Sequence, residues 1–451
     1  MASTYLTRTL GTPTNNKKWT LSAWIKKGHI GGDINTLFSA GGDSSNYQQI
    51  WSNYSSGQLQ YYSQVSGGSA LGSFRLSNRL RDVSGWYNLV ISFDSANVTD
   101  SERLKIYING NQELDTSVGG DLTYPTQNQA SLINSAIEHT IGKDSYRNAS
   151  YLDSSVSHLH FIDGTAYDAS YFGETDATTG EWKIKTSPSV TYGTNGFFIL
   201  KDGNSVTDQS PNTNNFTVGG GTLTKTEDSP DNVFATMNPL DNFWAGGTFT
   251  NGNNTIATGS STASYSTGTL GVNTGKFYWE VKVSSLPSDV SLIGIASELT
   301  TSNSKTLGTN ATDYAVYSYN GNKINGGNSS SYGNSFTLND IISVALDVTN
   351  SKLYFRKNND AWMNSGNPES GSTGTGAISI ASSSTTPTGF YFPSVGDWSM
   401  SNSLGFQINF GNGYFGTTAV SSAGTNASGN GIFEFDCPTG FTALSTKGLN
   451  L

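Results

Sequence analysis

Paired carboxylates are the first arrangement in this chain that could do chemistry. Retaining glycoside hydrolases hold two carboxyl groups about 5–5.5 Å apart, and alternate residues on one strand face can provide that separation. Glu434 and Asp436 alternate in this way near the C-terminal end of the sequence. A strand that carries such a site would place a third acidic residue at the next alternate position. That position is Pro438, which removes a backbone donor and ends a central strand. We therefore predict no catalytic residue and a protein that is not an enzyme.

Histidines and aspartates offer two candidate metal arrangements. His158 and His160 share one predicted strand face, but no third zinc ligand stands out, and a polar outward face is the alternative. Asp33 and Asp43 lie in Gly-rich loops and Asp144 follows a predicted strand, which makes these carboxylates candidate calcium ligands. Asx turns explain aspartate beside glycine and serine equally well. Apart from this calcium ion, the sequence predicts no cofactor.

Strands must position these side chains, because the composition argues against helices. The 451 residues include 52 Gly, aromatic residues make up 12% and charged residues 13%, and Gly, Ser, Thr and Asn abound where strong helix formers are scarce. Asn109-Gly110 is a tight-hairpin signal after one alternating run. The sequence predicts an all-β fold with two antiparallel β-sandwich (jelly-roll) domains joined by an irregular connector. The clearest alternating apolar runs are 19–25, 87–93, 104–108, 277–283 and 342–355.

Charge and hydropathy exclude several classes of partner. The formal net charge is −10, and clustered Lys and Arg are absent, so we expect no nucleic acid as partner. No apolar run approaches the length of a membrane span, which predicts no membrane insertion. Residues 1–27 contain no continuous apolar segment, so we expect no secretory signal. The single Cys437 excludes an intramolecular disulfide framework.

Six ordered segments stand out in the first part of the chain: KKWTLSAWIKKG (17–28), LFSAGGDSSN (37–46), WYNLVISFD (86–94), LKIYINGNQ (104–112), HTIGKD (139–144) and LHFIDGTAYDASYFGE (159–174). Together they resemble the concanavalin A-like, laminin G-like jelly rolls of phage virion proteins. This resemblance implies two curved antiparallel sheets over 1–174, with rim loops that bind glycans or proteins and often calcium.

A second ordered set of segments lies in the second half of the chain: GKFYWEVKV (275–283), LIGIAS (292–297), DYAVYSYNGNKINGG (313–327), DIISVALDVTNSKLYFRKNNDAW (340–362), GFYFPSVG (389–396) and INFG (408–411). Together they resemble a SPRY domain, a bent β-sandwich used for binding, and PTGFTALSTKGLN (438–450) matches the endings of phage versions. We place this domain at 243–451 and a connector at 175–242, with Gly219-Gly220-Gly221 as a flexible joint. The segment 412–433 is longer than the SPRY pattern and is expected to form an extra loop.

Aromatic and amide side chains near predicted loops are the candidate ligand contacts. Aromatic faces stack on sugar C–H groups, and amides hydrogen-bond sugar hydroxyls. Burial in the sandwich cores is the alternative for each aromatic residue. The candidates are Trp51, Tyr54, Tyr61, Tyr62, Tyr146, Tyr319, Asn320, Asn322, Asn325 and Trp362.

Together, these resemblances imply a non-enzymatic structural or adhesion protein of the phage virion. The expected form is a tail fibre or surface appendage that binds a host-surface glycan or protein and neighbouring virion proteins. We expect it to assemble in the host cytoplasm, to lie on the virion surface and to be a homo-oligomer. The alternatives are a capsid decoration or head-fibre protein, a polysaccharide depolymerase of the glycoside hydrolase type, and an intracellular SPRY adaptor.

Overall fold

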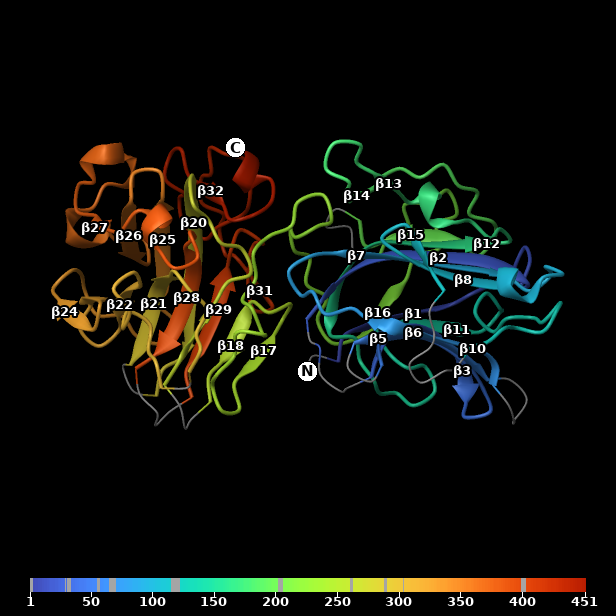
Figure 1. The fold of residues 1–451 in the computed structure, drawn as a ribbon. Helices are drawn as coiled ribbons and strands as arrows, with labels where there is room; N and C mark the ends of the chain where they lie inside the picture. Colours follow the sequence, from blue (N-terminus) through green and yellow to red (C-terminus); the bar gives the residue numbers. More distant parts are fainter. Residues whose placement is uncertain are drawn as a thin grey trace. The chain divides into compact units, whose positions relative to one another are not determined.

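The computed structural model describes residues 3–28, 30, 34–54, 57–64, 70–114, 122–201, 206–259, 263–287, 290–302, 304–398 and 403–451. The chain divides into two compact units, Met1–Lys225 with Ser229–Asp231, and Thr226–Asp228 with Asn232–Leu451 (Figure 1). Each unit contains one eight-stranded and one six-stranded sheet, so the predicted all-β class with two sandwiches is confirmed.

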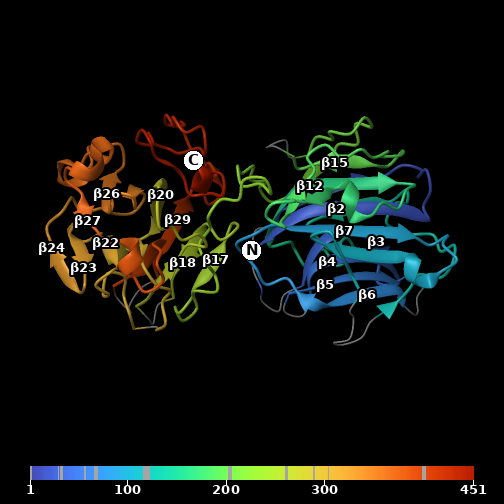
Figure 2. The same ribbon diagram turned by 45° about the horizontal axis from the view of Figure 1, so that its top comes forward.

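The two sheets of the first unit are built from antiparallel pairs (Figure 2). The larger sheet has the spatial order β10 (Leu122–Thr123), β6 (Ala70–Arg79), β5 (Gln58–Gln64), β4 (Asn46–Tyr54), β3 (Asn35–Asp43), β11 (Glu138–Ile141), β1 (Tyr5–Thr9) and β16 (Thr217–Gly220). The smaller sheet has the order β15 (Phe197–Ile199), β12 (Ser154–Asp163), β2 (Lys18–Lys27), β7 (Tyr87–Asp94), β8 (Leu104–Ile108) and β9 (Asn111–Glu113). A separate hairpin joins β13 (Gly173–Thr175) to β14 (Trp182–Ile184).

Alternation along the strands creates the core of the first unit. Trp19 and Leu21 on β2 point inward, and the Trp19 ring stacks on Phe93 with ring centroids 5.1 Å apart. The predicted turn after β8 is also present, because Asn109 and Gly110 have φ values of 48° and 81°. These positive φ values are those that a tight hairpin needs. The alternating runs predicted at 19–25, 87–93 and 104–108 are therefore confirmed.

The predicted connector is not a separate segment. Strands β15 and β16 extend the two sheets of the first unit by pairing with β12 and β1. Gly219-Gly220-Gly221 was expected to be a flexible joint, but Gly219 and Gly220 lie in β16. A Cβ atom at Gly219 would clash with the Tyr5 ring, so close packing against Tyr5 favours glycine here.

The second unit repeats the two-sheet plan with different connections. Its larger sheet has the order β17 (Thr248–Thr250), β18 (Thr255–Ala257), β29 (Gly405–Asn409), β20 (Lys276–Ser285), β25 (Ile341–Asp347), β26 (Lys352–Lys357) and β27 (Ile378–Ser379), and β32 (Thr442–Ala443) pairs with β20. Its smaller sheet has the order β19 (Tyr265–Thr267), β28 (Phe392–Asp397), β21 (Ser291–Ala296), β22 (Tyr314–Tyr317), β23 (Lys323–Asn325) and β24 (Asn328–Ser330). A short hairpin joins β30 (Tyr414–Phe415) and β31 (Thr418–Ala419).

Helical structure in the described part of the chain is confined to short 3₁₀ turns. No helix among the described residues is long and apolar enough to cross a membrane. The turns are Asp100–Glu102, Ala169–Tyr171, Met363–Ser365, Pro368–Thr373, Ser383–Thr385 and Gly448–Asn450.

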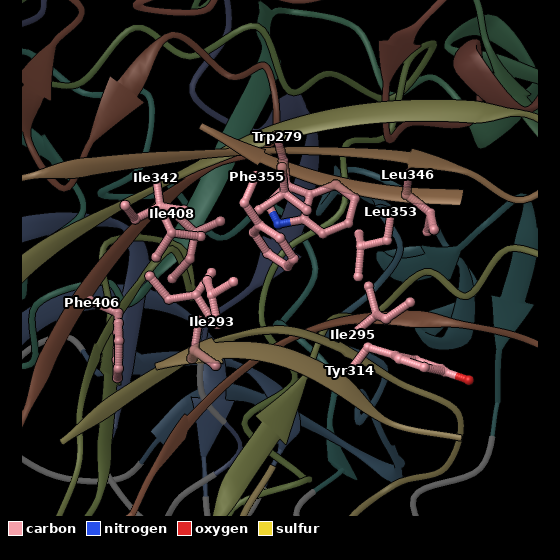
Figure 3. Close-up of a cluster of buried hydrophobic side chains, with 14 of the residues drawn as sticks. Trp279, Ile293, Ile295, Tyr314, Ile342, Leu346, Leu353, Phe355, Phe406 and Ile408 are labelled. Atoms are coloured by element: carbon pink, nitrogen blue, oxygen red, sulfur yellow. The ribbon is translucent and has the colours of Figure 1, made fainter. Parts of the chain in front are cut away.

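A buried apolar cluster fills the space between the two sheets of the second unit. Trp279 lies in it with 1% of its surface exposed, and Ile293 and Ile295 from the opposite sheet also belong to it (Figure 3). The runs 277–283 and 342–355 supply its other wall, as predicted. The segment 412–433 packs back on this unit, because Phe433 contacts the Tyr278 ring edge-on with centroids 4.8 Å apart.

Candidate functional site

The larger sheet of the first unit has a face that points away from the core. The strand registers place one residue of each strand in a continuous row across this face, and we call it the outer row. All its members carry a hydroxyl or amide group, while the preceding or following residues of the central strands enter the core. The outer row consists of Thr123, Ser73, Tyr62, Gln49, Ser39, Thr140, Thr7 and Thr217.

Aromatic side chains gather beside the middle of the outer row. Tyr62 stacks on both neighbours of Gln49 along the face, with ring centroids 5.6 Å from Tyr47 and 5.7 Å from Trp51. Tyr146 packs on the Tyr47 ring at 4.6 Å, and the Arg147 guanidinium lies 4.7 Å from the Tyr146 ring centroid. Tyr62 and Tyr146 remain half-buried, so part of this aromatic surface is open to a ligand.

The loop that carries Tyr146 is fixed by a buried carboxylate and by the outer row. The backbone N–H groups of Tyr146 and Arg147 donate to Asp144 Oδ1 at 3.1 and 3.2 Å, and the Arg147 guanidinium donates to Asp144 Oδ2. The N–H of Ser145 donates to Ser39 Oγ at 2.9 Å. These bonds hold the aromatic ring of Tyr146 over the sheet.

Several polar atoms of this face are buried without a hydrogen-bond partner among the described residues. Both amide atoms of Gln49 are in this state, as are Gln60 Oε1, Thr36 Oγ1 and Thr7 Oγ1. A buried polar group without a partner costs about 1–3 kcal/mol, and native proteins contain few of them. Gln49 is fully buried, so a ligand would reach its amide only if the half-buried Tyr62 ring beside it moved; the outer face with this ring is our candidate functional site.

The predicted contacts of the first unit divide into two groups. Trp51, Tyr62 and Tyr146 come together around Tyr47 on the outer face, but Trp51 is buried with 5% of its surface exposed, so only Tyr62 and Tyr146 are open to a ligand. Tyr61 was wrongly predicted as a contact, because it points to the opposite side of β5 and is fully buried in the core. The side chain of Tyr54 lies outside the described residues.

Two residues of the site were missed by sequence reasoning. Tyr47 and Gln49 alternate with Trp51 on β4, so the three side chains share one face. The alternation in NYQQIWSNY (46–54) carried this signal, but three aromatic residues and two glutamines do not separate a core face from a binding face.

Calcium binding receives no support from the described residues. The Asp43 carboxylate accepts a hydrogen bond from the N–H of Ser45 at 2.8 Å, which is an Asx turn within the β3–β4 hairpin. Asp144 is already occupied by backbone N–H groups and Arg147, and Asp33 lies outside the described residues. Within the described ranges, no three acidic, histidine or cysteine side chains are grouped for a metal ion. Asp43 and Asp144 therefore do not fit the predicted calcium site.

The other titratable groups considered for chemistry serve the fold. The N–H of Ser421 donates to Glu434 at 2.7 Å and that of Thr425 donates to Asp436 at 2.7 Å, so both carboxylates hold the loop before them. His160 is buried and stacks on Phe198 with ring centroids 3.9 Å apart. Burial is the main cause that lowers the pKa of His160 well below its usual value, which keeps the imidazole neutral.

The predicted contacts of the second unit do not form one site. Tyr319 is 65% exposed and lies beside Tyr317, which in turn contacts Trp398 with ring centroids 5.8 Å apart. Trp398 was missed because it follows the segment 389–396 and lacks an alternating pattern of its own. Trp362 lines a separate pocket.

The predicted asparagine contacts mainly stabilise the loop around β23. Asn325 Nδ2 donates to the backbone carbonyls of Ala311 and Asp313, which fixes the side chain within this loop. Asn322 donates to Ser329 Oγ at 2.9 Å, and Asn320 Oδ1 accepts from the N–H of Asn322. The Asn320 and Asn322 amides are thus already engaged in hydrogen bonds within this loop.

Comparison with known proteins assigns a family to part of each unit. Residues 2–170 match the concanavalin A-like lectin/glucanases superfamily, and residues 276–370 match the SPRY domain. No curated protein matches the chain.

Similar solved structures include SPRY domains and a pentraxin. The human HERC1 SPRY domain is 18% identical, with 38% of this chain and 96% of that chain covered and a TM-score of 0.29. Stonustoxin is 17% identical, with 39% and 27% covered and a TM-score of 0.28. The heptameric SAP-like pentraxin from Limulus polyphemus is 18% identical, with 37% and 72% covered and a TM-score of 0.26. The chain therefore carries a concanavalin A-like lectin/glucanase superfamily domain in its N-terminal part and a SPRY domain in its C-terminal half.

Proposed function

We propose that this protein is a non-enzymatic adhesion protein of a phage virion, a tail fibre or surface appendage whose first domain binds a host-surface glycan. The observation that carries the glycan proposal is the outer row, in which the unpartnered Gln49 amide lies beside the half-buried Tyr62, its partner in register on β5. Amide and hydroxyl groups recognise sugar hydroxyls, and aromatic rings accept the apolar face of a pyranose. The ligand would lie across the strands, along the row.

The virion part of the proposal is supported by the ordered resemblance of both halves to phage virion domains. Neighbouring virion proteins and further copies of the chain are the partners that such a location requires. Exposed Tyr319 and Trp398 on the second unit provide an aromatic surface for a protein partner. A capsid decoration would use the same surfaces at another place on the particle.

Isothermal titration with purified surface polysaccharides of the host tests the glycan proposal. Saturable binding without release of new reducing ends is the expected result, and release of reducing ends would show a depolymerase instead. Mass spectrometry of purified particles with antibody-gold labelling tests the location. A protein that is absent from the particles and found in a soluble cytoplasmic complex would contradict the virion proposal.

A further inference from the structure

We infer that the pocket beside Trp362 in the second unit is a separate site for one neutral pyranose. It forms where two segments meet, namely 331–334 after β24 and 357–365 from the end of β26 onward. Its volume is about 410 Å³, which lies within the usual range of ligand pockets, about 300–1,000 Å³. The site is independent of the outer row, because all of its residues belong to the second unit.

Trp362 is the aromatic residue with the largest ring that lines the pocket, and two neighbouring side chains contact its indole. The Arg356 guanidinium lies 4.8 Å from the ring centroid, and the Tyr354 ring meets the indole edge-on at 6.4 Å. Arg356 and Tyr354 do not line the pocket, and the Trp362 indole that they contact is half-buried. A preorganised indole is well suited to stack on the C–H face of a sugar ring.

The rim of the pocket offers hydrogen-bonding groups that are exposed to solvent. Ser331, Asn334, Asn364 and Ser365 are uncharged and exposed. Asn364 and Ser365 have φ values of 55° and 53°, a conformation that non-glycine residues rarely adopt in succession. Amides and hydroxyls that both donate and accept are the groups that sugar hydroxyls match.

The charge at the pocket selects against anionic ligands. Lys357 forms an ion pair with Asp340 at 3.0 Å and donates to the carbonyl of Ser335, so its charge is compensated. Asp360 is exposed, and among the described residues its carboxylate has neither an ion pair nor a hydrogen-bond donor. A free carboxylate accepts two sugar hydroxyls but repels a uronic or sialic acid. The pocket therefore fits a neutral pyranose.

Saturation-transfer NMR with the full chain tests this site. The probes are the methyl pyranosides of glucose, galactose and mannose at millimolar concentration, with glucuronic acid and N-acetylneuraminic acid as anionic comparisons. We expect transfer to at least one neutral probe and none to the acids. Asp360→Ala should weaken the binding of that probe about tenfold or more, as expected for loss of a charged hydrogen-bond partner.

Two further variants complete the test. Trp362→Ala should abolish the transfer that depends on Asp360, and the melting curve of this variant shows whether the unit remains folded. Phe390→Ala removes an aromatic side chain that is 39% exposed in the same unit but does not line the pocket, and it should retain the signal.

Three outcomes would overturn the inference: no transfer to any neutral probe, equal transfer to the acids, or binding of the neutral probe that Asp360→Ala leaves unchanged. Binding of a basic peptide in place of every sugar would show a protein site. Gln49→Met separates this site from the outer row, because it should leave the transfer that depends on Asp360 unchanged.

Discussion

Glu280 on β20 accepts a hydrogen bond from the backbone N–H of Phe435 at 2.8 Å, although the two residues are 155 positions apart in the sequence. The same carboxylate accepts from the N–H of Glu434 at 2.9 Å and from the Tyr278 hydroxyl at 2.9 Å. One buried side chain therefore fastens the C-terminal segment to the larger sheet of the second unit. Burial raises the pKa of Glu280 to about 7, although these donors oppose the shift.

The raised pKa of Glu280 predicts how the stability of the second unit depends on pH. The pKa of Glu280 is about 7 in the folded protein and 4.5 for an ordinary glutamate, so the folded state holds the proton more tightly between these values. The contribution of Glu280 to the free energy of unfolding should fall as the pH rises from about 4.5 to about 7, by about 3 kcal/mol. Urea unfolding at several pH values measures this slope.

Glu280→Gln provides the comparison, because glutamine does not titrate. The variant should lose that part of the pH dependence which belongs to Glu280, while the other acidic groups keep theirs. An unchanged slope between wild type and variant would show that Glu280 is charged throughout this range.

Trp279→Ala tests the core of the second unit. The indole is 1% exposed between the two sheets, so its removal leaves a cavity and should lower the free energy of unfolding by about 3–5 kcal/mol (Figure 3). Tyr319→Ala is the matched control, since a side chain with 65% exposure should change stability by only about 0.5 kcal/mol or less. Equal losses in both variants would contradict the packing described for Trp279.

The strand pattern was predictable because alternation in the sequence records which face is buried. Trp19 and Trp279 both fell on predicted core faces, and both are buried. The connector was not predictable, because β15 and β16 are short and pair with strands far away in the sequence. Pairing between distant strands leaves no local periodicity in the sequence. A glycine that packs closely against another residue also cannot be distinguished from a flexible glycine by sequence alone.

The site was predictable only in part, for a related reason. Tyr61 and Tyr62 are adjacent, yet one lies in the core and the other on the outer face. Aromatic type alone does not decide between these faces; the register with β4 does. The Gln49 amide became informative only once the structure showed that its atoms are buried without partners.

Calcium addition should leave the thermal unfolding of the first unit unchanged. Asp43 and Asp144 already accept hydrogen bonds from turn backbone groups, so binding an ion would have to break them. An ion present at 100 times its Kd would stabilise the folded state by about 2.7 kcal/mol. Calorimetry with calcium and with EDTA measures the difference, and a clear rise of Tm with calcium would refute this prediction.

Binding of the host polysaccharide by Gln49→Met is the most direct test of glycan recognition across the outer row. Methionine has a similar shape but no polar atoms, so it removes two unpartnered buried groups and should keep or slightly raise the unfolding temperature. Gln112→Met on β9, an exposed position of the other sheet, is the control. The account predicts that titration calorimetry shows binding at least about tenfold weaker for Gln49→Met and unchanged for Gln112→Met, which corresponds to about 1.4 kcal/mol. Wild-type affinity in a folded Gln49→Met variant would contradict it.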